Sequence, residues 1–210
     1  MDTGNKRKKL ILICSFALFA SLLVKGQTFS CASSSSTKQI EQYNKDFLKI
    51  LSTNLHEEYV VRFVALPSFS PEYAFQIIKM NDSVFKIETI IFQDNLWYIS
   101  CRDSVHFQIY NKDINEEFAH RLDVLFRILT DIEDRVIHIT MEDGDYFNFF
   151  RKSTNEVRCS QIADPEESSP WGKIIVLCNN LVKYASGELT ELDSIQVLNI
   201  ITDELISLKE

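Results

Sequence analysis

Glycine and proline are scarce in this chain, which contains 5 glycines and 4 prolines among its 210 residues. That scarcity excludes a collagen-like or low-complexity chain, because such chains are rich in one or both residues. Hydrophobic residues make up 45% of the sequence and charged residues 25%, a balance that excludes intrinsic disorder. A chain of this length can bury a sizeable core without obligatory disulfides. We therefore expect one compact folded domain.

Basic residues are outnumbered by acidic ones. The 22 lysines and arginines face 30 aspartates and glutamates, and the formal net charge is -8. An acidic protein repels the phosphate backbone of nucleic acids and the headgroups of anionic lipids. The charge therefore argues against a nucleic-acid partner and against membrane binding through the surface of the domain.

Recognisable reaction motifs are missing. The sequence contains no GxSxG nucleophile elbow, HExxH zinc motif, P-loop or GxGxxG fingerprint. Its cysteine spacings include no CxxC pair and no Cys/His zinc pattern. The acidic turn Glu142 to Asp145 lacks the alternating oxygen ligands and the closing glutamate of a calcium loop. We therefore assign no catalytic, cofactor-binding or metal-ligating residue, and no cofactor.

The four histidines are widely spread in the sequence. His106 and His138 lie in alternating segments and His120 lies on a predicted helix, so these three could converge in the fold. His56 stands apart from them. A lone histidine is more often an ordinary surface or half-buried residue than a ligand or base. Whether the protein is an enzyme stays open, and the missing motifs favour a protein that is not one.

No apolar run is long enough to span a membrane comfortably. The longest, Leu10 to Val24, follows a basic stretch at residues 6–9 and ends at Lys25. This is the pattern of an export signal peptide, and a retained membrane anchor is the alternative. The sequence therefore predicts export from the cytoplasm.

The signal divides the chain into three parts. We assign residues 1–30 to the signal peptide, 31–36 to a serine-rich tether or leader, and 37–210 to a single α+β domain. Removing residues 1–30 takes away 5 of the 22 basic residues and 1 of the 30 acidic ones, so the net charge becomes -12. The exported domain is thus more acidic than the whole chain.

The cysteines leave two questions open. Cys31, followed by Ala32 and four serines, resembles a bacterial lipoprotein junction, in which Cys31 would carry the lipid. A plain secreted protein with a serine leader is the alternative. Cys101 and Cys159 are the candidate disulfide pair, because an oxidising compartment permits a bridge, whereas unpaired buried thiols are the other interpretation.

Helices are predicted by apolar residues that recur every three or four positions. The spacing predicts helices over residues 37–54, 114–132 and 190–208, and another from Ser169-Pro170 to Tyr184 that Gly187 ends. For the second of these, Asp113 is the predicted N-cap, paired with Glu116 in a capping box.

Strands are predicted by β-branched and aromatic runs bounded by turn residues. They lie over residues 59–64, 73–80, 84–92, 96–99 and 105–110, and over a hairpin of 135–141 and 145–150 that turns at Asp143-Gly144. The order of the elements predicts an α+β fold, with a largely antiparallel sheet (meander plus hairpin) packed with about four helices.

Aromatic residues gather around the predicted strands. Alternation in Tyr146 to Phe150 places Phe147 and Phe149 on one face of a strand and Tyr146, Asn148 and Phe150 on the other. If both faces are covered, we expect helices on both sides; a bare face would be a binding surface. Core packing and stacking on a protein or glycan partner are the two interpretations of the wider set, which comprises Phe69, Tyr73, Trp97, Tyr98, Tyr146, Phe147, Phe149, Phe150 and Trp171.

Four short segments within residues 58–186 follow one another along the chain: Pro67–Tyr73 (PSFSPEY), Asn95–Tyr98 (NLWY), Asp143–Tyr146 (DGDY) and Ser168–Trp171 (SSPW). In this order they resemble a pattern in small exported proteins of Bacteroidetes whose function is unassigned. The resemblance implies a small exported α+β domain and brings no catalytic residue with it.

The sequence as a whole predicts a non-enzymatic exported domain, envelope-associated or periplasmic, that acts by contact with a protein or glycan. It would be a periplasmic or outer-envelope lipoprotein if Cys31 is lipidated, and otherwise a secreted protein. Membrane contact is expected only through that lipid. The alternative function is a hydrolase-type enzyme whose active site is assembled only in the fold.

Overall fold

A computed structural model describes residues 38–81, 83–99, 104–131, 144–154, 156–190, 198–199 and 202–203. These residues belong to one compact unit, Ser34–Glu210. The elements, in chain order, are α2 (Lys38–Asn54), β1 (Val61–Leu66), β2 (Tyr73–Lys79), β3 (Phe85–Phe92), β4 (Phe107–Ile114), α3 (Glu116–Asp131), β5 (Tyr146–Lys152), β6 (Val157–Ala163) and α4 (Pro170–Ser186). The predicted α+β class with an antiparallel sheet is confirmed.

The six strands form one sheet in the order β4-β3-β2-β1-β5-β6, and each strand runs antiparallel to its neighbours. β1 therefore lies inside the sheet, with β2 on one side and β5 on the other. Phe63 in β1 pairs with Phe75 in β2 and with Phe149 in β5. This row of aromatic residues crosses the middle of the sheet.

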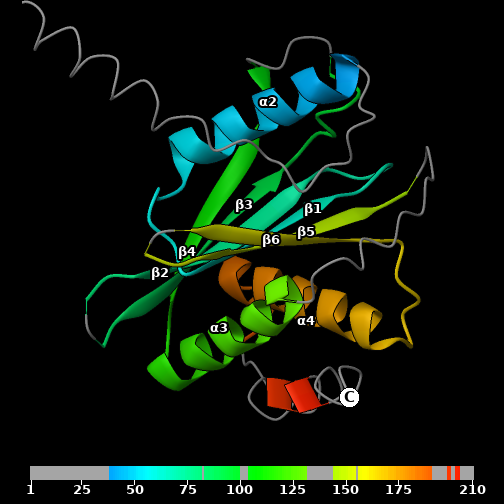
Figure 1. Cartoon of the computed structure of the whole chain (residues 1–210). Coiled ribbons are helices and arrows are strands. Elements are labelled where there is room, and N and C mark those ends of the chain that lie inside the picture. Colours follow the sequence, from blue (N-terminus) through cyan, green and yellow to red (C-terminus); the bar gives the residue numbers. More distant parts are fainter. Residues whose placement is uncertain are drawn as a thin grey trace, which may run out of the picture. The chain divides into compact units, whose positions relative to one another are not determined.

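The helices cover the two faces of the sheet unequally (Figure 1). α3 and α4 lie on the face that carries the aromatic row, since the Phe126 ring of α3 lies 5.5 Å from that of Phe149. α4 packs over β2, β3 and β4 on the same face. α2 lies on the other face, where the Phe47 ring is 5.5 Å from that of Phe92. Both faces are thus covered by helices.

Helix positions agree with the sequence periodicity. The predicted helices over 37–54, 114–132 and 169–184 correspond to α2, α3 and α4. Ser169 caps α4 because its Oγ accepts a hydrogen bond from the backbone N–H of Gly172 at 3.0 Å, and Gly187 ends the helix with φ +86°. The expected last helix, 190–208, lies largely outside the described residues.

The predicted start of α3 is wrong. β4 runs to Ile114, so Asp113 is a strand residue that pairs with Lys86 rather than an N-cap. Asn115 caps the helix instead, because its Oδ1 accepts from the backbone N–H of Phe118 at 2.7 Å. The alternation of β4 continues through Asp113, and the pairing with β3 outweighs the local capping signal.

Two predicted strands are corrected by the structure. Residues 96–98 form a turn, in which the Tyr98 N–H donates to the carbonyl oxygen of Asn95 at 3.2 Å. The predicted hairpin of 135–141 with 145–150 is also wrong, because β5 pairs with β1 on one side and β6 on the other. Residues 132–143 lie outside the described residues, and the sequence pattern predicts no strand where β6 lies.

The alternation predicted for Tyr146 to Phe150 is present in β5. Phe147 and Phe149 face α3, while Asn148 and Phe150 point to the other face, and all four are buried. Covered faces on both sides mean that β5 is a core strand. The aromatic run therefore offers no binding surface.

Thr89 is a buried polar residue in β3. It is fully buried, and its hydroxyl has no hydrogen-bond partner among the described residues. Replacing Thr89 by valine is expected to raise the free energy of unfolding by about 1 kcal/mol, because it removes an unsatisfied hydroxyl from the core. Urea denaturation measures the change. Thr130→Val is the matched control, since the Thr130 Oγ1 donates to the carbonyl oxygen of Phe126 at 2.8 Å and no gain is expected. Equal stabilities of Thr89→Val and the unaltered protein would contradict the prediction.

Tyr73 joins β2 to α4 by a hydrogen bond from its hydroxyl to Asn179 Oδ1 at 2.5 Å. Burial is the largest effect on its phenol and raises its pKa above the ordinary value, and burial does the same for Tyr59. The folded protein therefore favours the neutral phenols. Their contribution to stability is complete below the unfolded-state pKa of about 10 and is lost as the pH rises beyond it.

Alkaline pH is accordingly expected to destabilise the protein, and Tyr73→Phe should flatten this dependence. The variant loses about 1 kcal/mol at neutral pH with the hydrogen bond. Between pH about 10 and 12 it should then lose less stability than the unaltered protein, because Tyr73 no longer contributes while Tyr59 still does. Urea denaturation across this range is the measurement. Parallel curves for the two proteins would show that Tyr73 does not carry the effect.

Candidate functional site

The described residues of the four segments that carry the sequence resemblance lie at one end of the sheet. Because the strands are antiparallel, the same end of the sheet contains the end of β1, the start of β2, the end of β3, the start of β5 and the end of β6. We call this end of the sheet the loop end; its described residues are 67–72, 93–99, 104–106, 144–145 and 164–169. Side-chain hydrogen bonds connect these loops to one another.

Asn95 joins two of the loops. Its Nδ2 donates to the carbonyl oxygens of Ser70 at 2.8 Å, Ser68 at 3.3 Å and Pro67 at 3.5 Å. Its Oδ1 accepts from the backbone N–H of Trp97 at 2.9 Å. The amide therefore holds the backbone on both sides of Phe69 by hydrogen bonds and stabilises the turn that leads to Tyr98.

Asp145 joins two further loops to the first. Its Oδ1 accepts from the Ser68 N–H at 2.9 Å, while the Ser68 hydroxyl donates to the carbonyl oxygen of Gly144 at 2.8 Å. The Asp145 N–H donates to Asp164 Oδ1 at 2.7 Å. The carboxylates of Asp145 and Asp164 thus accept backbone hydrogen bonds. Among the described residues, no group of three or more His, Cys, Asp and Glu side chains could hold a metal ion.

Glu72 stabilises the turn at residues 95–98 through hydrogen bonds of its buried carboxylate. Its side chain is fully buried, and it accepts hydrogen bonds from the Tyr43 hydroxyl of α2 at 2.7 Å and from the Leu96 N–H at 2.8 Å. The Trp97 ring packs edge-on against Tyr43, with ring centroids 5.2 Å apart. One carboxylate therefore fixes the turn to both the sheet and α2.

Replacing Glu72 by glutamine is expected to lower the free energy of unfolding by about 1 kcal/mol, because the amide nitrogen places a donor against a donor. Urea denaturation followed by tryptophan fluorescence, to which both Trp97 and Trp171 contribute, measures the stability. Asp94→Asn is the matched control, since Asp94 is exposed and its loss should change stability by less than about 0.5 kcal/mol. Equal effects of the two variants would show that burial of Glu72 contributes nothing.

The loop end exposes two aromatic rings. Phe69 is 78% exposed and Tyr98 63%, the highest values among the large hydrophobic residues described as exposed. The remaining aromatic residues singled out in the sequence are buried or half-buried; these are Tyr73, Trp97, Tyr146, Phe147, Phe149, Phe150 and Trp171. Of the predicted aromatic cluster, Phe69 and Tyr98 alone are therefore available to a partner in the described structure.

His56 is the histidine that meets a buried carboxylate. Its Nδ1 pairs with Glu88 Oε1, and its backbone N–H donates to Glu88 Oε2 at 3.0 Å. Gln76 Nε2 donates to the same Oε2 at 2.7 Å, and Gln76 Oε1 accepts from Arg62 Nε at 2.9 Å. The Arg62 guanidinium lies 4.0 Å from the centroid of the Tyr59 ring. This chain of polar groups crosses the face that α2 covers.

The sequence pattern does not single out His56, although charged Glu88 inside an apolar strand is a usable signal. The Glu88 side chain is 6% exposed and that of His56 is 61% exposed. Burial is the largest effect on Arg62 and lowers the pKa of its guanidinium. The network orients one imidazole, yet the hydrogen bonds described for it include no serine or cysteine nucleophile.

The other histidines do not converge. His106 Nδ1 lies 3.6 Å from Asp94 Oδ2 at the loop end. His120 lies on α3, with its ring 5.7 Å from that of Phe85, where β3 begins at the opposite end of the sheet. His138 lies outside the described residues. No shared site is formed by His106 and His120.

The cysteines have different environments. Cys159 in β6 is disulfide-bonded. Cys178 in α4 is free and fully buried, and burial raises the pKa of its thiol well above the ordinary value. Cys31 and Cys101 lie outside the described residues. The pairing of Cys101 with Cys159 and the lipidation of Cys31 therefore stay predictions.

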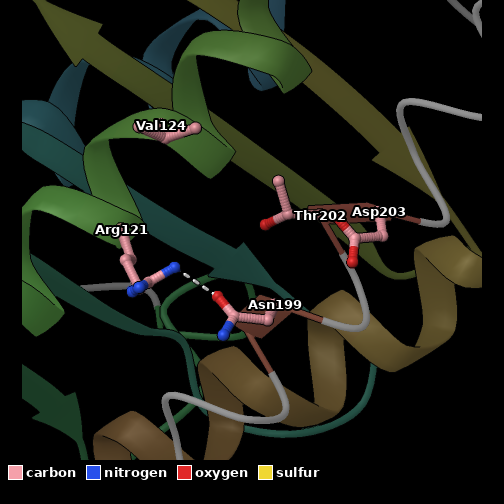
Figure 2. Close-up of a pocket in the computed structure, with 5 residues that line it drawn as sticks. All are labelled: Arg121, Val124, Asn199, Thr202 and Asp203. Atoms are coloured by element: carbon pink, nitrogen blue, oxygen red, sulfur yellow. Dashed lines mark hydrogen bonds between the residues drawn. The ribbon is translucent and has the colours of Figure 1, made fainter.

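A hollow of about 300 Å³ lies beside α3 (Figure 2), lined by Arg121, Val124, Asn199, Thr202 and Asp203. The Arg121 Nη1 donates to Asn199 Oδ1, and its Nη2 donates to Glu117 Oε1 at 3.0 Å. The guanidinium that could attract an anion is thus already paired on two sides. The hollow contains no arrangement suited to catalysis among the side chains described around it.

Comparison of the chain with protein-family models, curated proteins and solved structures finds no match. None of the described helices is long and apolar enough to cross a membrane. The resemblance to exported proteins of Bacteroidetes stays a prediction. The function of the chain is therefore inferred from its own side chains.

Proposed function

We propose that this chain is an exported, non-enzymatic binding domain that contacts a protein or glycan partner through Phe69 and Tyr98. The exposure of these two rings on loops joined by Asn95 carries the proposal. An exposed aromatic ring supplies a large contact area with few rotatable bonds. Loops that are fixed beforehand lose less conformational entropy on binding.

The proposed location is the periplasm or the outer envelope as a lipoprotein anchored through Cys31, or the exterior as a secreted protein. The basic and apolar pattern of residues 1–30 supports export. The disulfide at Cys159 agrees with an oxidising compartment. We further propose a fourth helix near the C-terminus, over residues 190–208, where apolar residues recur at helical spacing.

Peptide and oligosaccharide arrays probed with the purified full-length protein test the binding function. We expect the unaltered protein to bind one class of probe and Phe69→Ala/Tyr98→Ala to lose at least about tenfold in affinity, as central aromatic contacts do. Met80→Ala is the matched control, because Met80 is 50% exposed beside a turn at the opposite end of the sheet. Unchanged binding by the double variant, or no binding by the unaltered protein, would refute the proposal.

A hydrolase is the second candidate, and the pairing of His56 with Glu88 is the observation that favours it. A carboxylate at Nδ1 orients an imidazole so that Nε2 can act as a general base. Hydrolysis of p-nitrophenyl acetate separates the two functions. If the chain is a binding domain, neither the unaltered protein nor His56→Gln should hydrolyse the ester faster than free imidazole does. Faster hydrolysis that His56→Gln abolishes would favour the enzyme.

A further inference from the structure

Charge is distributed unequally along the strands. The loops of the loop end contain no lysine or arginine among their described residues, whereas they carry the exposed carboxylates of Asp94, Asp164, Glu166 and Glu167. Within the described part of the chain, the basic residue nearest to these loops in sequence is Lys173, in the first turns of α4. The opposite end of the sheet carries the basic side chains of Lys79, Lys86, Arg151, Lys152 and Arg158. Among the described residues, the loops at the end of the sheet that carries Phe69 and Tyr98 therefore contribute negative charges and no lysine or arginine.

We propose that the loop end binds a basic segment of another protein, in which lysine or arginine side chains lie over the Phe69 and Tyr98 rings. The inference rests on the proposed binding function and names its partner class. Aromatic faces attract ammonium and guanidinium groups, and nearby carboxylates strengthen this attraction. A partner of opposite charge is also steered toward the surface before contact.

The two aromatic residues and the carboxylates are held in one structural unit. Asp94 precedes Asn95, the residue whose amide holds the backbone around Phe69. Asp145, on the other side, accepts the N–H of Ser68 at 2.9 Å, directly beside Phe69. Carboxylates thus lie in two loops that are hydrogen-bonded to the loop of Phe69, which suits a partner with several cationic side chains better than a neutral glycan.

Fluorescence anisotropy with three labelled probes tests the proposal. The probes are a peptide of alternating lysine, arginine, serine and glycine, a matched peptide with glutamate at each basic position, and a neutral glucose oligosaccharide. The purified full-length protein should bind the basic peptide alone. Binding should weaken about tenfold in Phe69→Ala/Tyr98→Ala and stay unchanged in Met80→Ala.

Charge variants and salt supply the second measurement. Asp94→Asn/Glu166→Gln/Glu167→Gln should weaken binding of the basic peptide about threefold at low salt and reduce the dependence of binding on salt. Equal binding of the basic peptide by Phe69→Ala/Tyr98→Ala would overturn the proposal, since the attraction would then be unspecific.

Binding of the glucose oligosaccharide in preference to the peptide, sensitive to Phe69→Ala/Tyr98→Ala and insensitive to salt, would overturn the basic partner but leave the proposed binding function in place. Failure of all three probes would overturn the inference. The array experiment then decides separately whether the binding function also fails.

Discussion

Replacing Gly172 by alanine is expected to lower the free energy of unfolding by about 3 kcal/mol. Inside an ordinary helix the same replacement raises the free energy of unfolding, by at most about 1 kcal/mol. A Cβ atom on Gly172 would lie 2.2 Å from the carbonyl oxygen of Glu166 and 2.6 Å from the Cα of Glu167. Both atoms belong to the backbone, so no side-chain rotation relieves the overlap. The loop before α4 would have to move.

Thermal and urea denaturation measure the loss, and Gly187→Ala is the control. Gly187 has φ +86°, and a Cβ atom added to it would meet no heavy atom within 4 Å, so its substitution adds backbone strain alone, about 1 kcal/mol. A stabilised Gly172→Ala would show that the loop yields freely. Because Glu166 and Glu167 lie in that loop, the variant should also weaken binding of the basic peptide.

Replacing Phe63 by alanine is expected to lower the free energy of unfolding by about 4 kcal/mol, in the range for buried phenylalanines. Phe63 is fully buried in the inner strand β1. Its ring lies 5.4 Å from that of Phe75, 5.3 Å from that of Phe149 and 6.1 Å from that of Phe147. Removing it leaves a cavity where three strands meet.

Phe69→Ala is the matched control for Phe63→Ala, because it deletes the same atoms from a ring that is 78% exposed. We expect it to change stability by less than about 0.5 kcal/mol. Equal losses in the two variants would contradict the burial argument. The control also establishes that any loss of binding in Phe69→Ala does not come from unfolding.

Periodicity predicts the helices and the well-paired strands because these elements bury one face along their whole length. In α2, Tyr43, Phe47 and Leu51 are buried as their spacing indicates. In α4, the cap at Ser169 and the left-handed residue Gly187 act through local chemistry that the sequence displays directly. Such signals need no information about distant residues.

The wrong predictions arise where distant residues decide. Leu96 is fully buried and its apolar neighbours predict a strand, but the carboxylate of Glu72 accepts its N–H and the segment turns. β6 escapes prediction because its exposed and half-buried positions carry little apolar pattern. β5 pairs with β1 rather than with the preceding segment, and no local signal specifies that choice.

The candidate site is predictable in part. The sequence pattern selects Phe69 and Tyr98 among nine aromatic residues, yet it does not separate them from Phe147 and Phe149, which are buried. Which aromatic residues are exposed depends on which loops the strands bring together at one end of the sheet. The role of Asn95 is equally hidden, because its three carbonyl acceptors belong to another loop.

β1 has one neighbour that is close to it in the sequence, β2, and one that is distant, β5. β2 follows it directly, but its other neighbour, β5, is synthesised after β2, β3, β4 and α3. Until β5 arrives, β1 presents a row of unpaired N–H and C=O groups beside Val61 and Phe63, a template for other chains. Closing so distant a pair is slow, because the loop entropy is lost before the contacts form. A chain in which β5 has not yet joined the sheet is therefore the form most prone to aggregate.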